Sequence, residues 1–232
     1  MKRLLISLSA VLLMAAAPTV ASAGPLGGSF NISVYQANCG SSCNINSTDE
    51  QAVNTNPLIT AGDLIASGTY TGNIGFAEPS GGANNIKSFL LSDGGALGGT
   101  LASLGAQQLS TGNFDLTTVF VITGNVGSGS YTGNIVHDDG ASLYVGSGYS
   151  SDIMPAPGPV SATTTGYSGL TGAFELIYVE ANDLPADLTF NVDPNVNGFI
   201  PTSTVPEPLT LSLFGAGLVG AAALRRRKKK AA

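Results

Sequence analysis

The chain has no tryptophan, one histidine and only two cysteines among its 232 residues. The single histidine, His137, has no serine–histidine–aspartate spacing around it. Neither paired glutamates with flanking aromatic residues nor a phosphate-binding loop occurs in the sequence. Although His137 stands beside two acidic residues, a lone histidine at a turn is more often an exposed or hydrogen-bonded residue. We therefore expect no catalytic residues and no enzymatic activity, and an extracellular hydrolase is the least favoured alternative.

Basic residues are almost absent from the middle of the chain. Eight of the nine lie near the two ends, so that only Lys87 stands against fourteen acidic residues between Asp49 and Asp193. The resulting net charge of −13 repels phosphate backbones and excludes nucleic acid as a partner. Such a charge either keeps the domain soluble or attracts divalent cations, and both explanations stay open.

The two cysteines, Cys39 and Cys43, form a C-G-S-S-C segment. They are too few to supply the four ligands of a structural zinc site. In an oxidising compartment the favoured expectation is a short local disulfide between them. Free thiols are the second possibility, and metal binding is the last.

Long apolar runs and sustained helical periodicity are also missing between the two ends. Short apolar segments, separated by glycine-rich turn signals, occur at 30–35, 64–74, 114–123, 131–136, 143–145, 174–179 and 188–192. In the first of them, Phe30, Ile32 and Val34 alternate with polar residues, as in a half-buried strand. These features predict an all-β fold, an antiparallel β-sandwich of the jelly-roll kind, formed by one domain over residues 24–200.

Two proline-rich segments interrupt this pattern. Residues 154–159, with the sequence M-P-A-P-G-P, are predicted to form a surface loop outside any ladder, because proline lacks a backbone N–H and has a fixed φ. Residues 201–208 contain three more prolines and are predicted to form an extended linker.

The first 23 residues have the three parts of a secretory signal peptide. Lys2 and Arg3 form a basic start, residues 4–17 are apolar or small apart from two serines, and the segment ends in Ala21-Ser22-Ala23. This order predicts a signal helix that is removed by cleavage after Ala23, with Ala21 and Ala23 as the small residues of the cleavage site.

The last residues predict a single transmembrane helix. Sixteen apolar or small residues, 209–224, precede six consecutive arginines and lysines at 225–230. The apolar run would extend about 24 Å as a helix, slightly less than a hydrocarbon core of about 30 Å, and snorkelling can close the difference. The cations would stay on the cytoplasmic side, which places the acidic domain outside the inner membrane.

Pro206-Glu207-Pro208, the apolar run and the basic block follow one another in an order that resembles the PEP-CTERM sorting signal of Gram-negative bacteria. The resemblance implies that an exosortase, a membrane-embedded cysteine transpeptidase, cleaves the chain near this motif. The membrane-anchored form would then be an intermediate, and the mature protein would join the cell surface or an exopolysaccharide matrix.

One internal segment has possible metal chemistry. In residues 133–145, Asp138 and Asp139 are adjacent and Gly140 follows, so the segment is interpreted as strand, tight acidic turn, strand. Two neighbouring carboxylates repel each other unless a cation or hydrogen-bond donors intervene, and hard oxygen ligands on a glycine-containing loop suit calcium. The alternative is an Asx-turn that closes a hairpin, with Gly140 supplying a positive φ.

The sequence D-D-G-A-S-L-Y at 138–144 is similar to the D-D-G-x-x-L-Y signature of PA14-like β-sandwich domains, and residues 172–180 are similar to that family's following strand. The resemblance implies a PA14-like sandwich. In the adhesin branch of that family, the paired aspartates bind calcium, which holds sugar hydroxyls. Asp138 and Asp139 would be the calcium ligands.

These observations predict an exported, exosortase-processed protein of the cell surface or extracellular matrix, structural or associated with exopolysaccharide. The alternative is a calcium-dependent carbohydrate-binding or adhesin module that uses Asp138 and Asp139.

Overall fold

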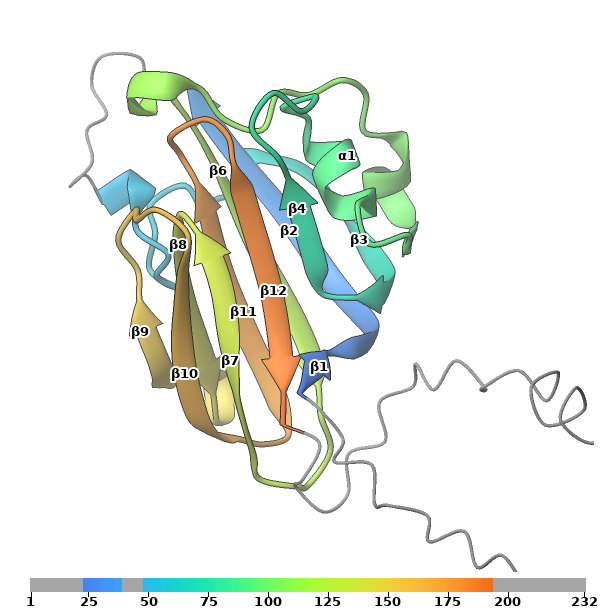
Figure 1. The fold of residues 1–232 in the computed structure, drawn as a ribbon, viewed down its shortest axis with the longest axis vertical. Coiled ribbons are helices and arrows are strands. Elements are labelled where there is room, and N and C mark those ends of the chain that lie inside the picture. Colours follow the sequence, from blue (N-terminus) through green and yellow to red (C-terminus); the bar gives the residue numbers. More distant parts are fainter. Residues whose placement is uncertain (1–22, 39–47, 194–232) are drawn as a thin grey trace, which may run out of the picture.

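The computed structural model describes residues 23–38 and 48–193, which form two antiparallel β-sheets packed face to face. Figure 1 shows the five-stranded sheet, with β4, β12, β7 and β10, in front of the larger one. The fold class expected from the sequence, an all-β antiparallel sandwich, is thus confirmed. The predicted signal helix, Ala21, Cys39, Cys43, the linker, Pro206 to Pro208 and the predicted transmembrane helix lie outside the described residues.

The five-stranded sheet is organised around β12. Its order is β1–β12–β7–β10, and β4 also pairs with β12, beside β1. The strands are β1 (Gly24–Pro25), β4 (Gly75–Glu78), β7 (Tyr131–Asp138), β10 (Thr163–Leu170) and β12 (Ala186–Val192). Every pairing in this sheet is antiparallel.

The seven-stranded sheet has the order β5–β3–β2–β6–β11–β8–β9, again with antiparallel pairs throughout. Its strands are β2 (Gly27–Asn38), β3 (Leu64–Asn73), β5 (Ala96–Leu97), β6 (Leu116–Asn125), β8 (Gly140–Val145), β9 (Ser151–Ala156) and β11 (Ala173–Glu180). All seven apolar segments identified in the sequence overlap strands.

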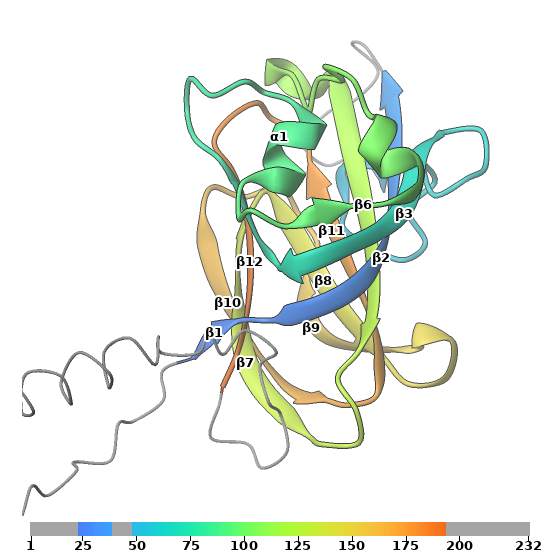
Figure 2. The ribbon, with the colours of Figure 1, turned by 90° about the vertical axis from the view of Figure 1, so that its right-hand side faces the viewer.

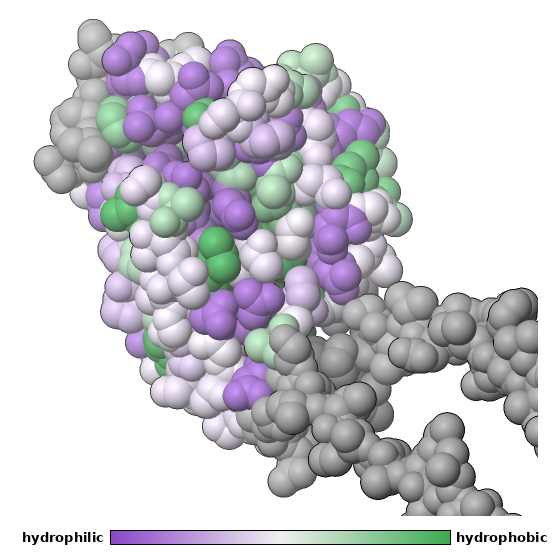
Figure 3. Space-filling view, viewed as in Figure 1, coloured by the Kyte–Doolittle hydropathy of each residue, from purple (hydrophilic) through white to green (hydrophobic). Residues whose placement is uncertain are grey.

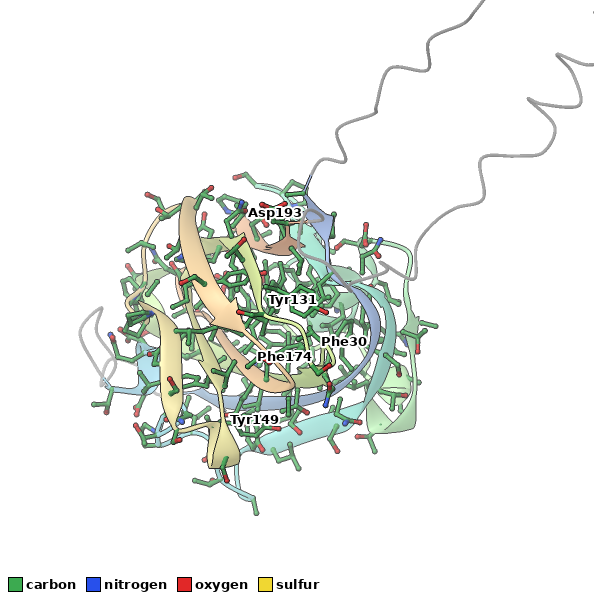
Figure 4. The ribbon with its side chains drawn as sticks, turned by 90° about the horizontal axis from the view of Figure 1, so that it is seen from below. Phe30, Tyr131, Tyr149, Phe174 and Asp193 are labelled. Atoms are coloured by element: carbon green, nitrogen blue, oxygen red, sulfur yellow. The ribbon has the colours of Figure 1, made fainter. Side chains whose placement is uncertain are left out.

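The core lies between the two sheets. The alternating residues Phe30, Ile32 and Val34 of β2 are all buried, as the pattern predicts. From below, Phe30, Tyr131 and Phe174 lie between the sheets (Figure 4). The ring centroids of Phe30 and Phe174 are 6.2 Å apart.

A short helix, α1 (Ile86–Leu91), completes the aromatic part of this core. Asn85 caps it by accepting hydrogen bonds from the backbone N–H groups of Lys87 and Ser88. Figure 2 shows α1 beside β3, at the end of the sandwich away from β1. The helix brings Phe89 within 5.6 Å of the Tyr178 ring in a stacked arrangement, so it helps to bury the inner face of β11.

The outer face of the seven-stranded sheet is also partly covered. A second cluster of buried residues comprises Ala52, Leu58, Val119, Tyr144, Ile177, Val179 and Ala181. Its first two members come from the segment before β3, and the others from or beside the central strands. Strands such as β8, buried at every position, therefore have little polar alternation in their sequences.

The predicted loop at 154–159 is wrong for its first three residues. Met154, Pro155 and Ala156 belong to β9, which pairs with β8 in a register that places Pro155 opposite Ser142. β9 is the edge strand of its sheet, and an edge strand tolerates a proline because one side of it has no ladder partner.

The two ends of the domain lie side by side. β1 pairs with β12 so that Gly24 is opposite Val192, in the lower part of the domain in Figure 1. β7 starts near this end, where the Asp193 N–H donates to the Thr132 carbonyl, and runs away from it to Asp138. A strand of that length places Asp138 about 23 Å from the paired ends. Within residues 23–38 and 48–193, no helix is long and apolar enough to cross a membrane.

Candidate functional site

The Asp138-Asp139-Gly140 segment connects the two sheets. β7 ends at Asp138 in the five-stranded sheet, and β8 begins at Gly140 in the seven-stranded sheet. The segment is strand, short acidic connection, strand, as interpreted from the sequence. The alternative, an Asx-turn that closes a hairpin with a positive φ at Gly140, is wrong, because the two strands do not pair and Gly140 does not have a positive φ. A glycine is required there for another reason, since a Cβ atom would lie 2.4 Å from the Pro157 carbonyl oxygen. The Asp138–Asp139 peptide bond is cis.

Residues 138–140 are the place where the chain crosses from one sheet to the other, and Asp139 attaches this crossing to the end of β11. Its Oδ2 accepts hydrogen bonds from the backbone N–H groups of Ala181, at 2.9 Å, and Asn182, at 3.1 Å. The residue is only 5% exposed. Burial and the charge of Asp138 raise the pKa of Asp139 to about 6, against the lowering effect of the two N–H donors.

Asp138 faces a second acid across the ladder. In the register of β7 and β12, Asp138 is opposite Asp187, whose Oδ1 accepts from the Thr189 hydroxyl at 3.0 Å. Burial raises the pKa of Asp138, and the charge of Asp187 raises it further, while a backbone hydrogen bond from Ala162 and the proximity of His137 act in the opposite direction. The structure thus gathers three carboxyl groups at this crossing.

His137 is part of the framework of the crossing. Its ring is completely buried, with Nδ1 2.6 Å from the Asp139 carbonyl oxygen and Nε2 2.9 Å from the Thr165 hydroxyl. Because a carbonyl oxygen can only accept, Nδ1 carries a proton and donates it. The expectation of a hydrogen-bonded histidine is confirmed, and both ring nitrogens have protein partners.

Sequence reasoning missed Tyr178 and Glu180, which extend the crossing into the core. Both side chains are completely buried on β11. The Tyr178 hydroxyl oxygen contacts the Asp138 carbonyl oxygen and lies 3.0 Å from Glu180 Oε2, while the Ser110 hydroxyl donates to Glu180 Oε1 at 2.9 Å. The sequence did contain a signal for the burial of Glu180. Glu180 follows Phe174, Leu176 and Tyr178 at intervals of two residues, so its side chain lies on the same face of β11.

The crossing contains oxygen atoms of the kind that bind calcium, but only some of them are free to act as ligands. Among residues 23–38 and 48–193, no group of three or more histidine, cysteine, aspartate or glutamate side chains is arranged to hold a metal ion. Asp139 Oδ2 already accepts two hydrogen bonds. A calcium ion would therefore rely on the Asp138 carboxylate, the other Asp139 oxygen and ligands such as carbonyl groups or water.

The face of the five-stranded sheet that meets solvent is polar and has few charges. Thr132, Thr164 and Ser168 are exposed on it, and the Asn191 side-chain amide donates to the Asn134 side chain at 3.0 Å. Figure 3 shows hydrophilic and near-neutral residues over this face, with hydrophobic residues only scattered among them. It offers no broad apolar patch for a protein partner.

Comparisons with known proteins identify the C-terminal segment. Residues 204–228 match the family model of the PEP-CTERM protein-sorting motif, which includes Pro206, Glu207 and Pro208. The match confirms the resemblance noted in the sequence. It implies an exported protein that an exosortase processes and that is sorted to the cell surface.

Among solved structures, the chain is similar to the PA14 domain of the MpAFP antifreeze protein. The similarity has a TM-score of 0.46 at 16% sequence identity and covers 81% of this chain and 92% of that one. A comparison with curated proteins finds no match.

Proposed function

We propose that the β-sandwich is a structural component of the cell surface or of an exopolysaccharide matrix, to which it is delivered by its C-terminal sorting motif. The observation that carries this proposal is the match at residues 204–228, because the motif specifies a destination outside the cytoplasm. The chain is then a substrate of exosortase catalysis rather than a catalyst.

The position of the chain ends supports delivery from a membrane-anchored intermediate. Since β1 and the end of β12 are paired, a sorting segment that follows Asp193 leaves the domain beside Gly24. The crossing at Asp138 lies on the far side, about 23 Å along β7.

The polar face of the five-stranded sheet supports contact with polysaccharide. Its threonine, serine and asparagine side chains both donate and accept hydrogen bonds, as sugar hydroxyl groups do. The acidic character of the domain favours solubility in a hydrated matrix.

We assign no catalytic role to the buried polar groups. His137 uses both ring nitrogens for contacts within the protein, and Glu180 uses both carboxyl oxygens. A general acid or base must reach a bound substrate, and these groups are enclosed by the fold.

Fractionation of cells that express the full chain and a variant lacking residues 206–230 tests the proposal. The full chain should be found at the surface or in the matrix, and the deletion variant should be released into the periplasm or medium. A variant that lacks only the basic residues 225–230, and therefore keeps the apolar run, serves as a control. Recovery of the full chain in the cytosol would refute the proposed destination.

A second candidate function is calcium-dependent carbohydrate binding by Asp138 and Asp139. The observation in its favour is the gathering of two adjacent buried carboxyl groups, with Asp187 opposite the first. Calorimetric titration of residues 24–204 with calcium should give a binding heat that the Asp138→Ala/Asp139→Ala variant loses and an Asp152→Asn control on β9 keeps. The absence of both heat and a shift in melting temperature would eliminate this function, whereas binding would justify a glycan array with and without calcium.

A further inference from the structure

We propose that Glu180 is a neutral carboxylic acid in the folded protein and that it donates its proton to Tyr178, so that the two residues together hold the Asp138 carbonyl and position the sheet crossing. This inference is independent of the proposed function, because it concerns a group buried inside the domain.

The Tyr178 hydroxyl group has two oxygen neighbours but only one hydrogen to share with them. Its oxygen lies within hydrogen-bonding distance of two others, the Asp138 carbonyl oxygen and Glu180 Oε2. A hydroxyl group has one hydrogen, and a carbonyl oxygen has none to give. If Tyr178 donates to Asp138, the contact with Glu180 is a hydrogen bond only when Glu180 supplies the hydrogen.

The alternative arrangement places two oxygen atoms in contact with no hydrogen between them. If Glu180 were ionised, Tyr178 would donate to its carboxylate, and the lone pairs of the tyrosine oxygen would face those of the Asp138 carbonyl oxygen. That contact would be repulsive, because two buried oxygen atoms would meet without a hydrogen between them. The proton on Glu180 removes the conflict.

The second oxygen of Glu180 agrees with a neutral acid. Oε1 accepts from the Ser110 hydroxyl at 2.9 Å, which is the role of the carbonyl oxygen in a carboxylic acid. Oε2 then acts as the hydroxyl oxygen and donates to Tyr178. The hydrogen bonds run in one direction, from Ser110 through Glu180 and Tyr178 to the Asp138 carbonyl, and bonds in such a chain strengthen one another.

The charges around Glu180 also favour the neutral form. The titratable groups that face it are Tyr178 on its own strand, with Asp138 and Asp139 at the crossing, where His137 is bonded to the Asp139 carbonyl. In the described part of the chain the only lysine or arginine is Lys87, whose Nζ donates to the Ala102 carbonyl. A buried carboxylate without a cation is strongly disfavoured. Burial, and next the charge of Asp139, hold the pKa of Glu180 well above its usual range.

The arrangement makes Glu180 a positioning residue. It connects the segment before β6, the inner face of β11 and the end of β7, three parts of the chain that are distant in sequence. Through Tyr178 it fixes a main-chain atom of Asp138, and so the place at which the chain passes from one sheet to the other.

Carbon-13 NMR of the full chain, labelled only in glutamate carboxyl groups, tests the inference. Glutamate labelling removes the signals of Asp138 and Asp139. At pH 8 one carboxyl resonance should keep the chemical shift of a protonated acid. This resonance should be missing from Glu180→Gln and present in Glu175→Gln, a matched change on the same strand.

A second variant keeps the test decisive if Glu180→Gln does not fold. In Tyr178→Phe the acceptor of the proton is lost, so the protonated resonance should move or disappear, while the resonances of the other glutamates keep their shifts. A spectrum of the wild-type chain in which every glutamate is ionised at pH 8 would overturn the inference. So would spectra in which neither variant changes any protonated resonance.

Discussion

Replacement of Asp139 by asparagine should stabilise the domain above pH 6 and leave its stability unchanged in acid. Asparagine has nearly the same shape as aspartate, and its side-chain oxygen can still accept from the N–H groups of Ala181 and Asn182. The substitution therefore removes the ionisation of residue 139 while keeping its attachment to the end of β11.

The size of the effect follows from the pKa of Asp139. Its value is about 6 in the folded protein and 3.8 for an ordinary aspartate. At about 1.4 kcal/mol for each pH unit, this difference corresponds to about 3 kcal/mol. Below pH 3.8 both the folded and the unfolded chain hold the proton, so Asp139 contributes no pH dependence.

The direction of the effect is set by the raised pKa. Between pH 3.8 and 6 the unfolded chain releases its proton while the folded chain retains it, and the free energy of unfolding falls as the pH rises. Above pH 6 the loss is constant. The Asp139→Asn variant escapes this loss, so its advantage over the wild type should grow from zero in acid to about 3 kcal/mol at neutral pH.

Urea unfolding from pH 3.5 to 8, in the presence of a calcium chelator, measures this difference. Asp93→Asn, a change of the same kind at an exposed position, should show no comparable pH-dependent gain. An Asp139→Asn variant that is less stable than the wild type at pH 7 would show that the Asp139 carboxylate stabilises the crossing in its charged form. A difference that is the same at every pH would show that folding does not raise the pKa of Asp139.

Three further substitutions test the packing. Phe89→Ala should lower the free energy of unfolding by about 3–5 kcal/mol in urea titrations, because the ring is buried against Phe76, Phe120 and Tyr178; a loss below 1 kcal/mol would mean that α1 is not part of the core. Gly133→Ala should lower the melting temperature, because its Cβ would lie 2.1 Å from the Asn191 carbonyl oxygen. Gly105→Ala, whose Cβ would have no atom within 4 Å, should not lower it. Equal effects of the two changes would contradict the close approach of β7 and β12. Asn85→Ala should cost about 1 kcal/mol by removing the cap of α1, and an unchanged unfolding midpoint would argue against the cap.

Much of the strand content could be predicted from local patterns. In β2 the alternation of Phe30, Ile32 and Val34 specifies a buried face without reference to any other part of the chain. The same holds for the C-terminal motif, whose three parts are contiguous and which a family model also recognises at residues 204–228. The paired acids at Asp138 and Asp139 were likewise visible, because their adjacency is a property of the sequence.

The strands that escaped prediction had weaker local signals. β10 has exposed residues at most of its positions, so its alternation has little hydrophobic contrast. β9 contains Pro155, which excludes a central strand but not an edge strand. Which strand forms the edge depends on the order of the whole sheet, and that order is set by pairings between distant segments.

The sandwich class and the sorting motif could be recognised from the sequence alone, because alternation and motif order are local. The character of the acidic segment became apparent only in the folded protein. Asp138 and Gly140 are separated by one residue, yet they belong to different sheets, since β7 pairs with β12 and β8 pairs with β11. Glu180 became part of the same site through Ser110, 70 residues away, and through Tyr178, which contacts Asp138. Burial and hydrogen-bond partners of this kind arise only when both sheets are assembled.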